Sequence, residues 1–372
     1  MAALFLYYMR PRQIQSVLDR KLEDQKNMAE ETQKTTIRRK NYVGITGYLK
    51  ENTLECVKTK DGKDAIRGNL IIATSDTEAY KVQFYASHFY GNGNENSTYK
   101  DLLEVLPSRT MSIAAYLSGN PAANFQTAAQ CSTKVYVRAH MEEYATKLDN
   151  KERSIVTLRG DSVKLKTATD TRSFVPEAMF AVDMYIESMS EETKYDKETE
   201  NVEPTGRLVI SGLLPDYRGV MNRISFVVPA GKLADFVQNN YEIHDTANFT
   251  GKLVNIEQKE VAAETVDDPF SWNGGSETQF KTTFVRERQI LGRNPGKLPI
   301  HEGDENCITQ EEVKNGLVLR DQRIADNTTR RNTGSGNRRV SAGMVANSFA
   351  PTSTSAVGSD DQFGSDFDDF NF

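Results

Sequence analysis

The chain has 372 residues, three cysteines and a formal net charge of −6, with 38% hydrophobic and 9% aromatic residues. No apolar run approaches the about 20 residues that a membrane-spanning helix needs. The odd number of widely spaced cysteines argues against a disulfide framework and indicates a reducing, cytoplasmic compartment. The length corresponds to about two domains with a remainder. A mean hydropathy of −0.58 indicates that part of the chain does not pack into a core.

The negative charge is concentrated near the C-terminal end. Beyond Arg339 there is no lysine or arginine, and the five aspartates found there give residues 340–372 a charge of −5. The rest of the chain is close to neutral and can carry local basic surfaces, although the sequence pI is near 5.5. The overall charge therefore does not exclude a nucleic-acid ligand.

Residues 1–40 are interpreted as an N-terminal extension. The apolar run at residues 2–9 is short, has no basic residue before it and is followed by no small-residue cleavage site, so it is not typical of a signal peptide. A polar run opens at Met28 and has the character of a natural N-terminus. Residues 1–27 are then either an extension from a start codon assigned too far upstream or a loosely ordered helix.

Residues 41–148 predict a first small β-barrel. Strands are expected at 42–49, 66–74 and 79–86, where β-branched and aromatic residues dominate. Asp61-Gly62 predicts a hairpin turn, because glycine adopts positive φ at low cost. A short helix capped by Ser97 or Thr98 precedes a further strand at 134–139. This order is that of a five-stranded barrel with a helix between strands three and four.

Residues 149–292 predict a second barrel of the same kind. Strands are expected at 180–187, 205–214, 222–228, 247–256 and 281–290, with a short helix at 230–239. The fold class expected from both units is mainly β, with two small barrels that carry short helices.

The last part of the chain predicts a linker and an interaction segment. Residues 293–358 are polar and short of large apolar side chains, so we expect a flexible linker. Residues 359–372 form an acidic tip in which four phenylalanines are interleaved with the five aspartates. A terminal Phe372 with a free carboxylate suits capture in a partner's apolar pocket beside a basic residue. The alternative is a tail that only increases solubility.

The tip resembles the C-terminal end of bacterial and phage single-stranded DNA-binding proteins, through Asp366-Phe367-Asp368-Asp369 followed by an aromatic end. In that family an OB-fold body is followed by a flexible linker and an acidic tip. The resemblance implies that the tip recruits replication and recombination proteins through Asp366, Phe367, Asp368, Asp369, Phe370 and Phe372. Asn371 stands where the bacterial family typically has proline. Two barrels in one chain point to a phage or mobile-element relative and leave oligomeric assembly open.

Binding of a single strand needs cations for the phosphates and aromatic faces for the bases. Strand positions and loops supply both kinds of side chain, although a tyrosine on a strand also serves simply as packing. Trp272 lies in an expected loop, as either a mobile DNA contact or a lid over a barrel end. The predicted DNA-binding residues are Tyr48, Arg67, Lys81, Tyr85, Tyr136, Arg138, Arg207, Tyr217, Arg218, Arg223, Lys252 and Trp272.

No catalytic or cofactor motif is found in the sequence. There is no phosphate-binding glycine loop, no zinc-ligand spacing among the four histidines and no nucleophile elbow. We therefore expect a non-enzymatic, cofactor-free protein that coats single-stranded DNA in replication, recombination and repair, with homo-oligomers possible. The alternatives are a phage virion or assembly protein with an acidic recruiting tail, and a nuclease or other nucleic-acid enzyme, for which the sequence shows no recognisable set of metal-binding carboxylates.

Overall fold

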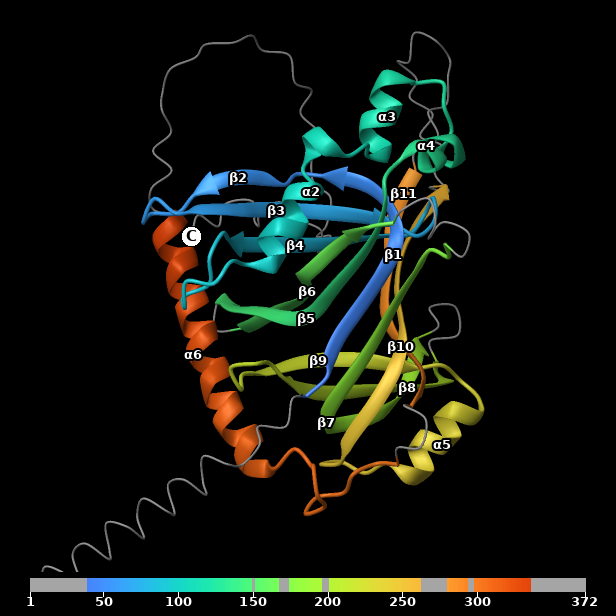
Figure 1. Ribbon diagram of the computed structural model, residues 1–372. Coiled ribbons are helices and arrows are strands. Elements are labelled where there is room, and N and C mark those ends of the chain that lie inside the picture. The colour runs from blue at the N-terminus through green and yellow to red at the C-terminus, as the bar shows by residue number, and fades with distance from the viewer. Residues whose placement is uncertain are drawn as a thin grey trace, which may run out of the picture. The chain divides into compact units, whose positions relative to one another are not determined.

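The computed structural model describes residues 39–148, 151–166, 174–195, 201–261, 280–293 and 298–335. Every element below belongs to the unit that begins at Lys40. The expected N-terminal extension up to residue 38, Trp272 and the acidic tip lie outside the described residues. Within the described ranges, eleven strands form one hydrogen-bonded sheet that closes on itself twice (Figure 1).

The strands before residue 166 form the first barrel. They are β1 (Asn41–Asn52), β2 (Glu55–Lys58), β3 (Asp64–Ala73), β4 (Ala79–Ser87), β5 (Lys134–Leu148) and β6 (Lys151–Leu165). Around the barrel the order is β1, β3, β4, β6, β5 and back to β1, with β4 and β6 parallel and the other pairs antiparallel. β2 adds a short arm to β3. The barrel closes because β1 pairs with both β3 and β5.

The second barrel repeats this topology. Its strands are β7 (Glu177–Tyr195), β8 (Val202–Pro215), β9 (Met221–Val228), β10 (Thr246–Val261) and β11 (Phe280–Arg293). Their order is β7, β8, β9, β11, β10 and back to β7, with β9 and β11 parallel. If the arm β2 is left out, both barrels have five strands in the same arrangement. The first strand pairs with the second and the fourth, and the third is parallel to the fifth.

Helical segments connect the third and fourth strands of both barrels. In the second barrel this segment is α5 (Lys232–Asn240). In the first it comprises α2 (Ser97–Glu104), η2 (Pro107–Arg109), α3 (Ile113–Gly119) and α4 (Phe125–Cys131). Asn96, Ser112 and Asn124 cap α2, α3 and α4 by accepting hydrogen bonds from backbone amides of the first turn. The predicted fold class is confirmed: the molecule is mainly β, with two OB-like barrels and short helices.

The two barrels are joined through their first strands. β1 and β7 pair antiparallel, from Asn41 opposite Val182 to Thr46 opposite Glu177. One apolar cluster runs through both barrels as a result, and it includes Val43 on β1 and Phe180 on β7, which face each other across this junction. The cores of the barrels are therefore one continuous hydrophobic region.

The first barrel extends beyond the expected domain boundary at residue 148. β6 completes this barrel between β4 and β5, at a place where the sequence pattern predicts no strand. The reason is that β5 and β6 project from the barrel as a two-stranded ribbon, where Lys151 to Ser154 are exposed in succession. This half of the strand lacks the alternation of buried and exposed side chains by which a strand is recognised.

A long helix stands where the sequence predicts a flexible linker. α6 (Gln310–Ser335) runs along one side of both barrels (Figure 1). Its Arg320 is 3% exposed and donates two hydrogen bonds of 2.7 Å to Glu143 on β5. Gly316 allows close approach to the second barrel, because a Cβ there would lie 2.5 Å from Cγ of Met221. The helix therefore contacts β5 of the first barrel and β9 of the second. No helix in the described ranges is long and apolar enough to cross a membrane.

Candidate nucleic-acid interface

The outer side of β1 and β5 gathers aromatic and cationic side chains. Val43 and Ile45 on β1 and Val135 and Val137 on β5 are fully buried, so the residues that alternate with them point outward. We call this surface the β1–β5 face. It consists of Tyr42, Gly44 and Tyr48 on β1, Lys134, Tyr136 and Arg138 on β5, and the neighbouring Lys166 and Phe174.

Two tyrosines meet over a glycine at the centre of this face. The hydroxyl groups of Tyr42 and Tyr136 are in direct contact. They lie over Gly44, where a Cβ would be 2.6 Å from the Tyr42 hydroxyl oxygen and 3.4 Å from that of Tyr136. Burial raises the pKa of Tyr136 to about 12, and the hydrogen bond with Tyr42 acts in the same direction. Near neutral pH the Tyr136 ring is therefore uncharged, and the hydroxyl contact holds the two rings side by side.

The cations of the β1–β5 face lie over aromatic rings. The Arg138 guanidinium is 5.5 Å from the centroid of the Tyr42 ring, and Lys166 Nζ is 5.4 Å from that of Tyr136. Lys134 Nζ lies 5.3 Å from the centroid of Phe174. These distances are within the range of cation–π attraction. None of the three cations forms an ion pair with a carboxylate among the described residues, so each retains its capacity to bind an anion.

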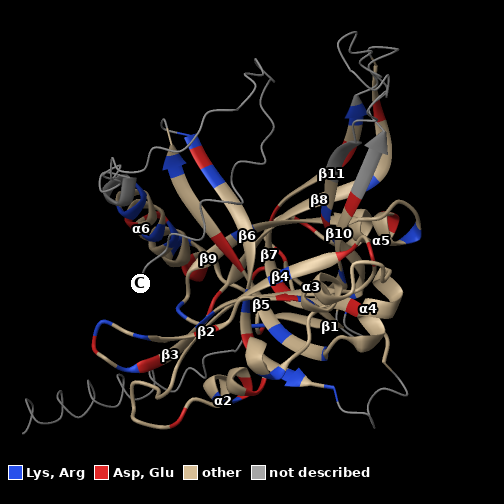
Figure 2. Ribbon diagram, turned by 90° about the horizontal axis from the view of Figure 1, so that it is seen from above, with Lys and Arg blue, Asp and Glu red and all other residues tan. Residues whose placement is uncertain are grey.

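Three of the predicted arginines elsewhere are already held by carboxylates. Figure 2 shows that lysine and arginine are interspersed with acidic residues over both barrels. The ion pairs are Arg67 with Glu55 at 2.8 Å, Arg207 with Glu287 at 2.8 Å and with Glu192 at 3.3 Å, and Arg223 with Glu187 at 2.6 Å. A phosphate would have to displace these partners. The three arginines are therefore poorer candidates for DNA contacts than Arg138.

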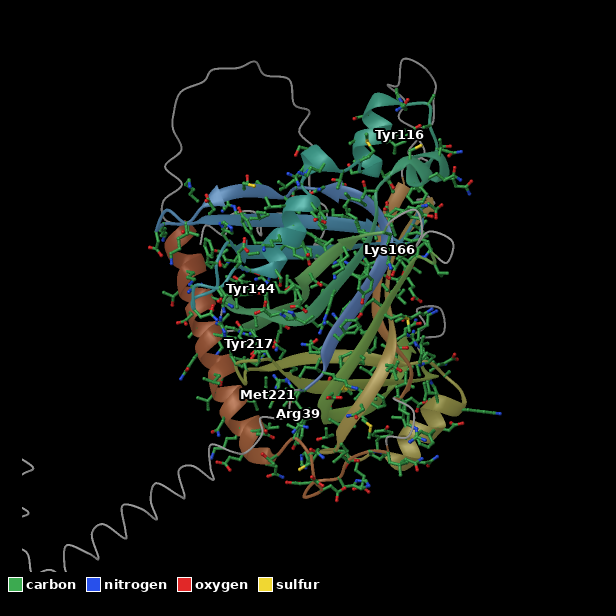
Figure 3. The ribbon with its side chains drawn as sticks, viewed as in Figure 1. Arg39, Tyr116, Tyr144, Lys166, Tyr217 and Met221 are labelled. Carbon is green, nitrogen blue, oxygen red and sulfur yellow. The ribbon has the colours of Figure 1, made fainter. Side chains whose placement is uncertain are left out.

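The remaining predicted residues lie outside the β1–β5 face. Lys81 and Tyr85 are exposed on the outer side of β4, where Tyr85 faces Arg67 across the β3–β4 pair. Tyr217, 83% exposed, and Arg218 form the tip of the β8–β9 hairpin, with the guanidinium 5.0 Å from the ring centroid. Figure 3 shows Tyr217 beside α6 and Lys166 away from that helix. The structure thus places Tyr48, Tyr136 and Arg138 together but not the whole predicted set.

Five members of the face are not among the predicted DNA-binding residues: Tyr42, Gly44, Lys134, Lys166 and Phe174. Lys134 and Lys166 stand at strand ends, and Phe174 belongs to no strand. Gly44 has no side chain that could suggest a contact. Only the register, which places Gly44 opposite Arg138 and Thr46 opposite Tyr136, shows that these positions adjoin. No sequence periodicity supplies that register.

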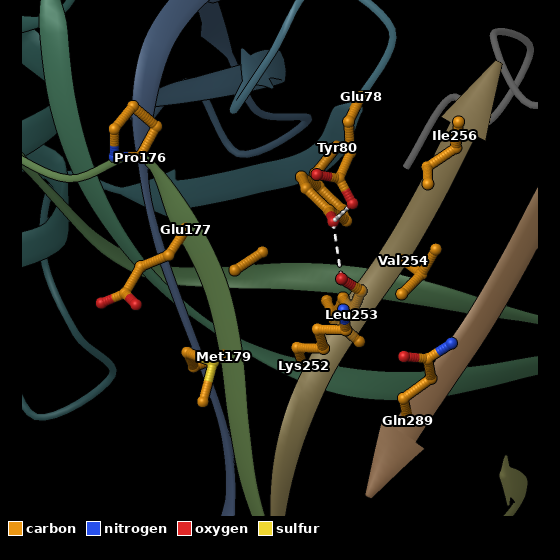
Figure 4. Close-up of a pocket in the computed structure, with 11 residues that line it drawn as sticks. Glu78, Tyr80, Pro176, Glu177, Met179, Lys252, Leu253, Val254, Ile256 and Gln289 are labelled. Carbon is orange, nitrogen blue, oxygen red and sulfur yellow. Dashed lines mark hydrogen bonds between the residues drawn. The ribbon is translucent and has the colours of Figure 1, made fainter. Parts of the chain in front are cut away.

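A polar pocket of about 400 Å³ lies where the β3–β4 turn meets β10 (Figure 4). The Tyr80 hydroxyl donates to the Leu253 carbonyl at 2.7 Å and contacts the Glu78 carboxylate at 2.5 Å. Burial and Glu78 raise the pKa of Tyr80 well above its usual value. Lys252, the last predicted cation, lines the pocket. In the described part of the chain, no group of three or more His, Cys, Asp or Glu residues is placed to hold a metal ion.

Comparison with known proteins gives one family match. The model of a family described as YorF matches residues 40–329. No curated protein matches the chain at a significant level.

Similar solved structures include the single-stranded DNA-binding protein from Thermus aquaticus. Its wild-type form and a deletion mutant are each 13% identical over 72% of this chain and 98% of theirs, with TM-scores of 0.35 and 0.37. A replication protein A heterotrimer bound to ssDNA is 10% identical over 80% of this chain and 55% of its own, with a TM-score of 0.15. All three scores are below 0.5, so a functional proposal has to rest on this chain's own geometry.

Proposed function

The chain belongs to the YorF family, and from the geometry of its β1–β5 face we propose that it binds single-stranded DNA without sequence preference. One observation carries the proposal: Lys134, Arg138 and Lys166 lie over aromatic rings and not against carboxylates. A bound strand can replace these cation–π contacts, because its bases stack on the rings while its phosphates pair with the cations.

This arrangement favours a single strand over a duplex. Stacking on Tyr42 or Tyr136 requires an exposed base face, and a duplex buries those faces between neighbouring base pairs. The same stacking is available to all four bases, so little sequence preference is expected. Phosphate contacts add an electrostatic part to the affinity that weakens as salt increases.

The proposed biological role is to coat and protect single-stranded DNA during replication, recombination and repair, in the cytoplasm of a bacterial host if the gene is phage-borne. The acidic tip would recruit partner proteins, as the interleaved aspartates and phenylalanines of residues 359–372 suggest. What supports this role is the layout of a two-barrel body, a cationic and aromatic face and an acidic, phenylalanine-containing segment at residues 359–372. No enzymatic step is part of the proposal.

The test is a titration of fluorescently labelled oligo-dT and of a duplex at two salt concentrations. We expect the full-length protein to bind the single strand preferentially and to lose affinity as salt is raised. Tyr136→Ala should weaken binding by about fivefold to a hundredfold, the range found for loss of one stacked base. Arg138→Gln should also weaken binding and make it less dependent on salt.

Two further variants decide which surface binds. Arg67→Gln removes a cation that Glu55 already holds, so it should change affinity much less than Arg138→Gln. Tyr85→Ala removes a half-exposed ring from the β3–β4 surface. If Tyr85→Ala costs more affinity than Tyr136→Ala, the site lies on β3 and β4. If the wild-type protein binds no oligo-dT at low salt, the proposed function is wrong.

A further inference from the structure

One row of cross-strand partners continues the β1–β5 face onto the second barrel. Arg138 on β5 pairs with Gly44 on β1, and Gly44 pairs with Met179 on β7. Met179 pairs with Lys252 on β10, and Lys252 pairs with Gln289 on β11. Directly paired residues in antiparallel strands project on the same side of the sheet. These residues therefore form one line across both barrels.

The surface between the tyrosine pair and Lys252 is uncharged. Met179 is half-buried on the outer side of β7, and the neighbouring row consists of Tyr42, Ala181 and Thr250. Small and apolar side chains at these places leave the sheet surface open beside the Tyr42 ring. Such a surface suits the bases and sugars of an extended strand better than its phosphates.

A cation stands at the far end of this uncharged surface. Lys252 is exposed and makes no ion pair within the described residues. Three strand spacings separate β5 from β10, which is about 14 Å along the sheet. Lys252 also lines the pocket at the junction of the barrels, with Met179 and Gln289 (Figure 4). The row thus reaches a pocket that is lined by the exposed ammonium group of Lys252.

Acidic residues also border the row. Glu287 on β11 accepts a hydrogen bond of 2.8 Å from the Gln289 side chain and interacts electrostatically with Lys252, and Glu78 lines the pocket beside Lys252. Glu177 is exposed on β7 and pairs with Thr46, one outward position along from Met179. It lines the same pocket as Lys252. A phosphate near Lys252 would therefore be repelled by Glu177. Removal of the charge of Lys252 should therefore weaken binding of the strand, and removal of the charge of Glu177 should strengthen it.

We infer that a single strand held on the β1–β5 face continues across β7 to Lys252, so that both barrels contact one strand through the β1–β7 junction. The inference rests on the proposed function and adds to it a path and a second contact point. It requires a strand long enough to leave the tyrosine pair and reach β10. A short oligonucleotide fills the first part of the path only.

The experiment compares oligo-dT of about 5 nucleotides, near the lower limit for one such barrel, with oligo-dT of about 20 nucleotides, which is longer than one barrel covers. Lys252→Gln should leave the affinity for the short oligonucleotide unchanged and weaken the long one by about two- to fivefold, the effect of one exposed charge pair. Glu177→Gln should strengthen binding of the long one by a similar factor. Lys232→Gln, the same charge change at an exposed position of α5, is the matched control.

The outcomes separate this inference from the proposed function. If Lys252→Gln and Lys232→Gln weaken the long oligonucleotide equally, Lys252 acts only through net charge and the inference is wrong. The same holds if Glu177→Gln fails to strengthen binding. The proposed function survives either result as long as Tyr136→Ala and Arg138→Gln weaken both lengths. If the wild-type protein binds neither oligonucleotide, the proposed function itself is wrong.

Discussion

The tyrosine pair depends on the absence of a side chain at one position. Gly44 pairs with Arg138 in the middle of the β1–β5 face, where the alternation of the strand would place an outward side chain. The hydroxyl groups of Tyr42 and Tyr136 occupy that space instead. Aromatic rings that cover a strand glycine also shield backbone that would otherwise be open to water. Gly44 therefore positions two rings without contacting a ligand itself.

Gly44→Ala should separate the rings while the barrel stays folded. The new methyl group would lie 2.6 Å from the Tyr42 hydroxyl oxygen, which is the far end of a side chain that can rotate away. We expect binding to oligo-dT to weaken by about 1 kcal/mol, near the lower limit for one stacked base. The measurement is a titration of the variant beside Gly91→Ala, because no atom lies within 4 Å of a Cβ at Gly91.

Thermal unfolding of both variants controls for loss of fold. Equal affinities of Gly44→Ala and the wild-type protein would show that the arrangement of the two tyrosines does not matter for binding. Tyr136→Phe separates the role of the hydroxyl group from that of the ring, because it removes the hydroxyl contact but keeps the ring. Retained binding in that variant would indicate that the ring, and not the hydroxyl group, serves the ligand.

At the scale of elements, α6 is held by an ion pair that is almost fully removed from water. The Arg320 and Glu143 side chains are 3% and 1% exposed, and the guanidinium also contacts Glu152 on β6. Glu143 accepts a further hydrogen bond of 2.9 Å from the backbone amide of Arg223 on β9. Glu143 and Glu152 raise the pKa of Arg320 above its usual value against the effect of burial. One carboxylate thus connects the helix with both barrels.

Arg320→Met should destabilise the fold strongly, because it leaves the Glu143 carboxylate buried without its cation. The expected loss is about 3–5 kcal/mol of unfolding free energy, the usual cost of removing one partner of a buried pair. Urea unfolding of the variant measures it. Lys314→Met on the exposed side of the same helix should stay within about 0.5 kcal/mol of the wild-type protein. Similar stability of the two variants would contradict the structural role of the pair.

The same helix shows where sequence patterns fail. Residues 310–335 are polar and predict no amphipathic helix, since the face turned to the barrels carries Arg320, Arg323 and Asn327 alongside Ile324. Their partners lie more than a hundred residues away in the sequence. By contrast, β4 and β9 alternate buried and exposed residues regularly, and both were predicted near their observed positions. Local periodicity therefore predicts barrel strands well and elements attached by long-range polar contacts poorly.

At the scale of the whole molecule, the candidate site illustrates the same limit. Tyr136 and Arg138 were predicted because the alternation of β5 puts both on one side. Their partners Gly44 and Lys166 come from other segments, and only the closed barrel brings them together. Three of the predicted arginines carry carboxylate partners that no sequence pattern identifies. Residue type thus indicates a ligand class, whereas the pairing of charges decides which cations remain available.

The distribution of charge along the chain leads to the last prediction. Deletion of residues 359–372 removes five aspartates and changes the formal net charge from −6 to −1. A tethered segment of this charge competes with phosphates at an effective concentration of about 1 mM. We therefore expect the shortened protein to bind oligo-dT at least as tightly as the full chain, with the largest gain at low salt, where charges are screened least.

Two matched variants separate the charge of the tip from its aromatic rings. Replacing its five aspartates with asparagine should reproduce the gain in affinity, since only the charge competes with phosphate. Replacing its four phenylalanines with alanine should leave DNA binding unchanged and abolish partner recruitment, because rings that fill a partner's pocket are lost. Fluorescence titrations at low and high salt measure the first two effects, and co-purification with replication proteins measures the third. Weaker DNA binding by the shortened protein would show that the tip supports the interface and does not compete for it.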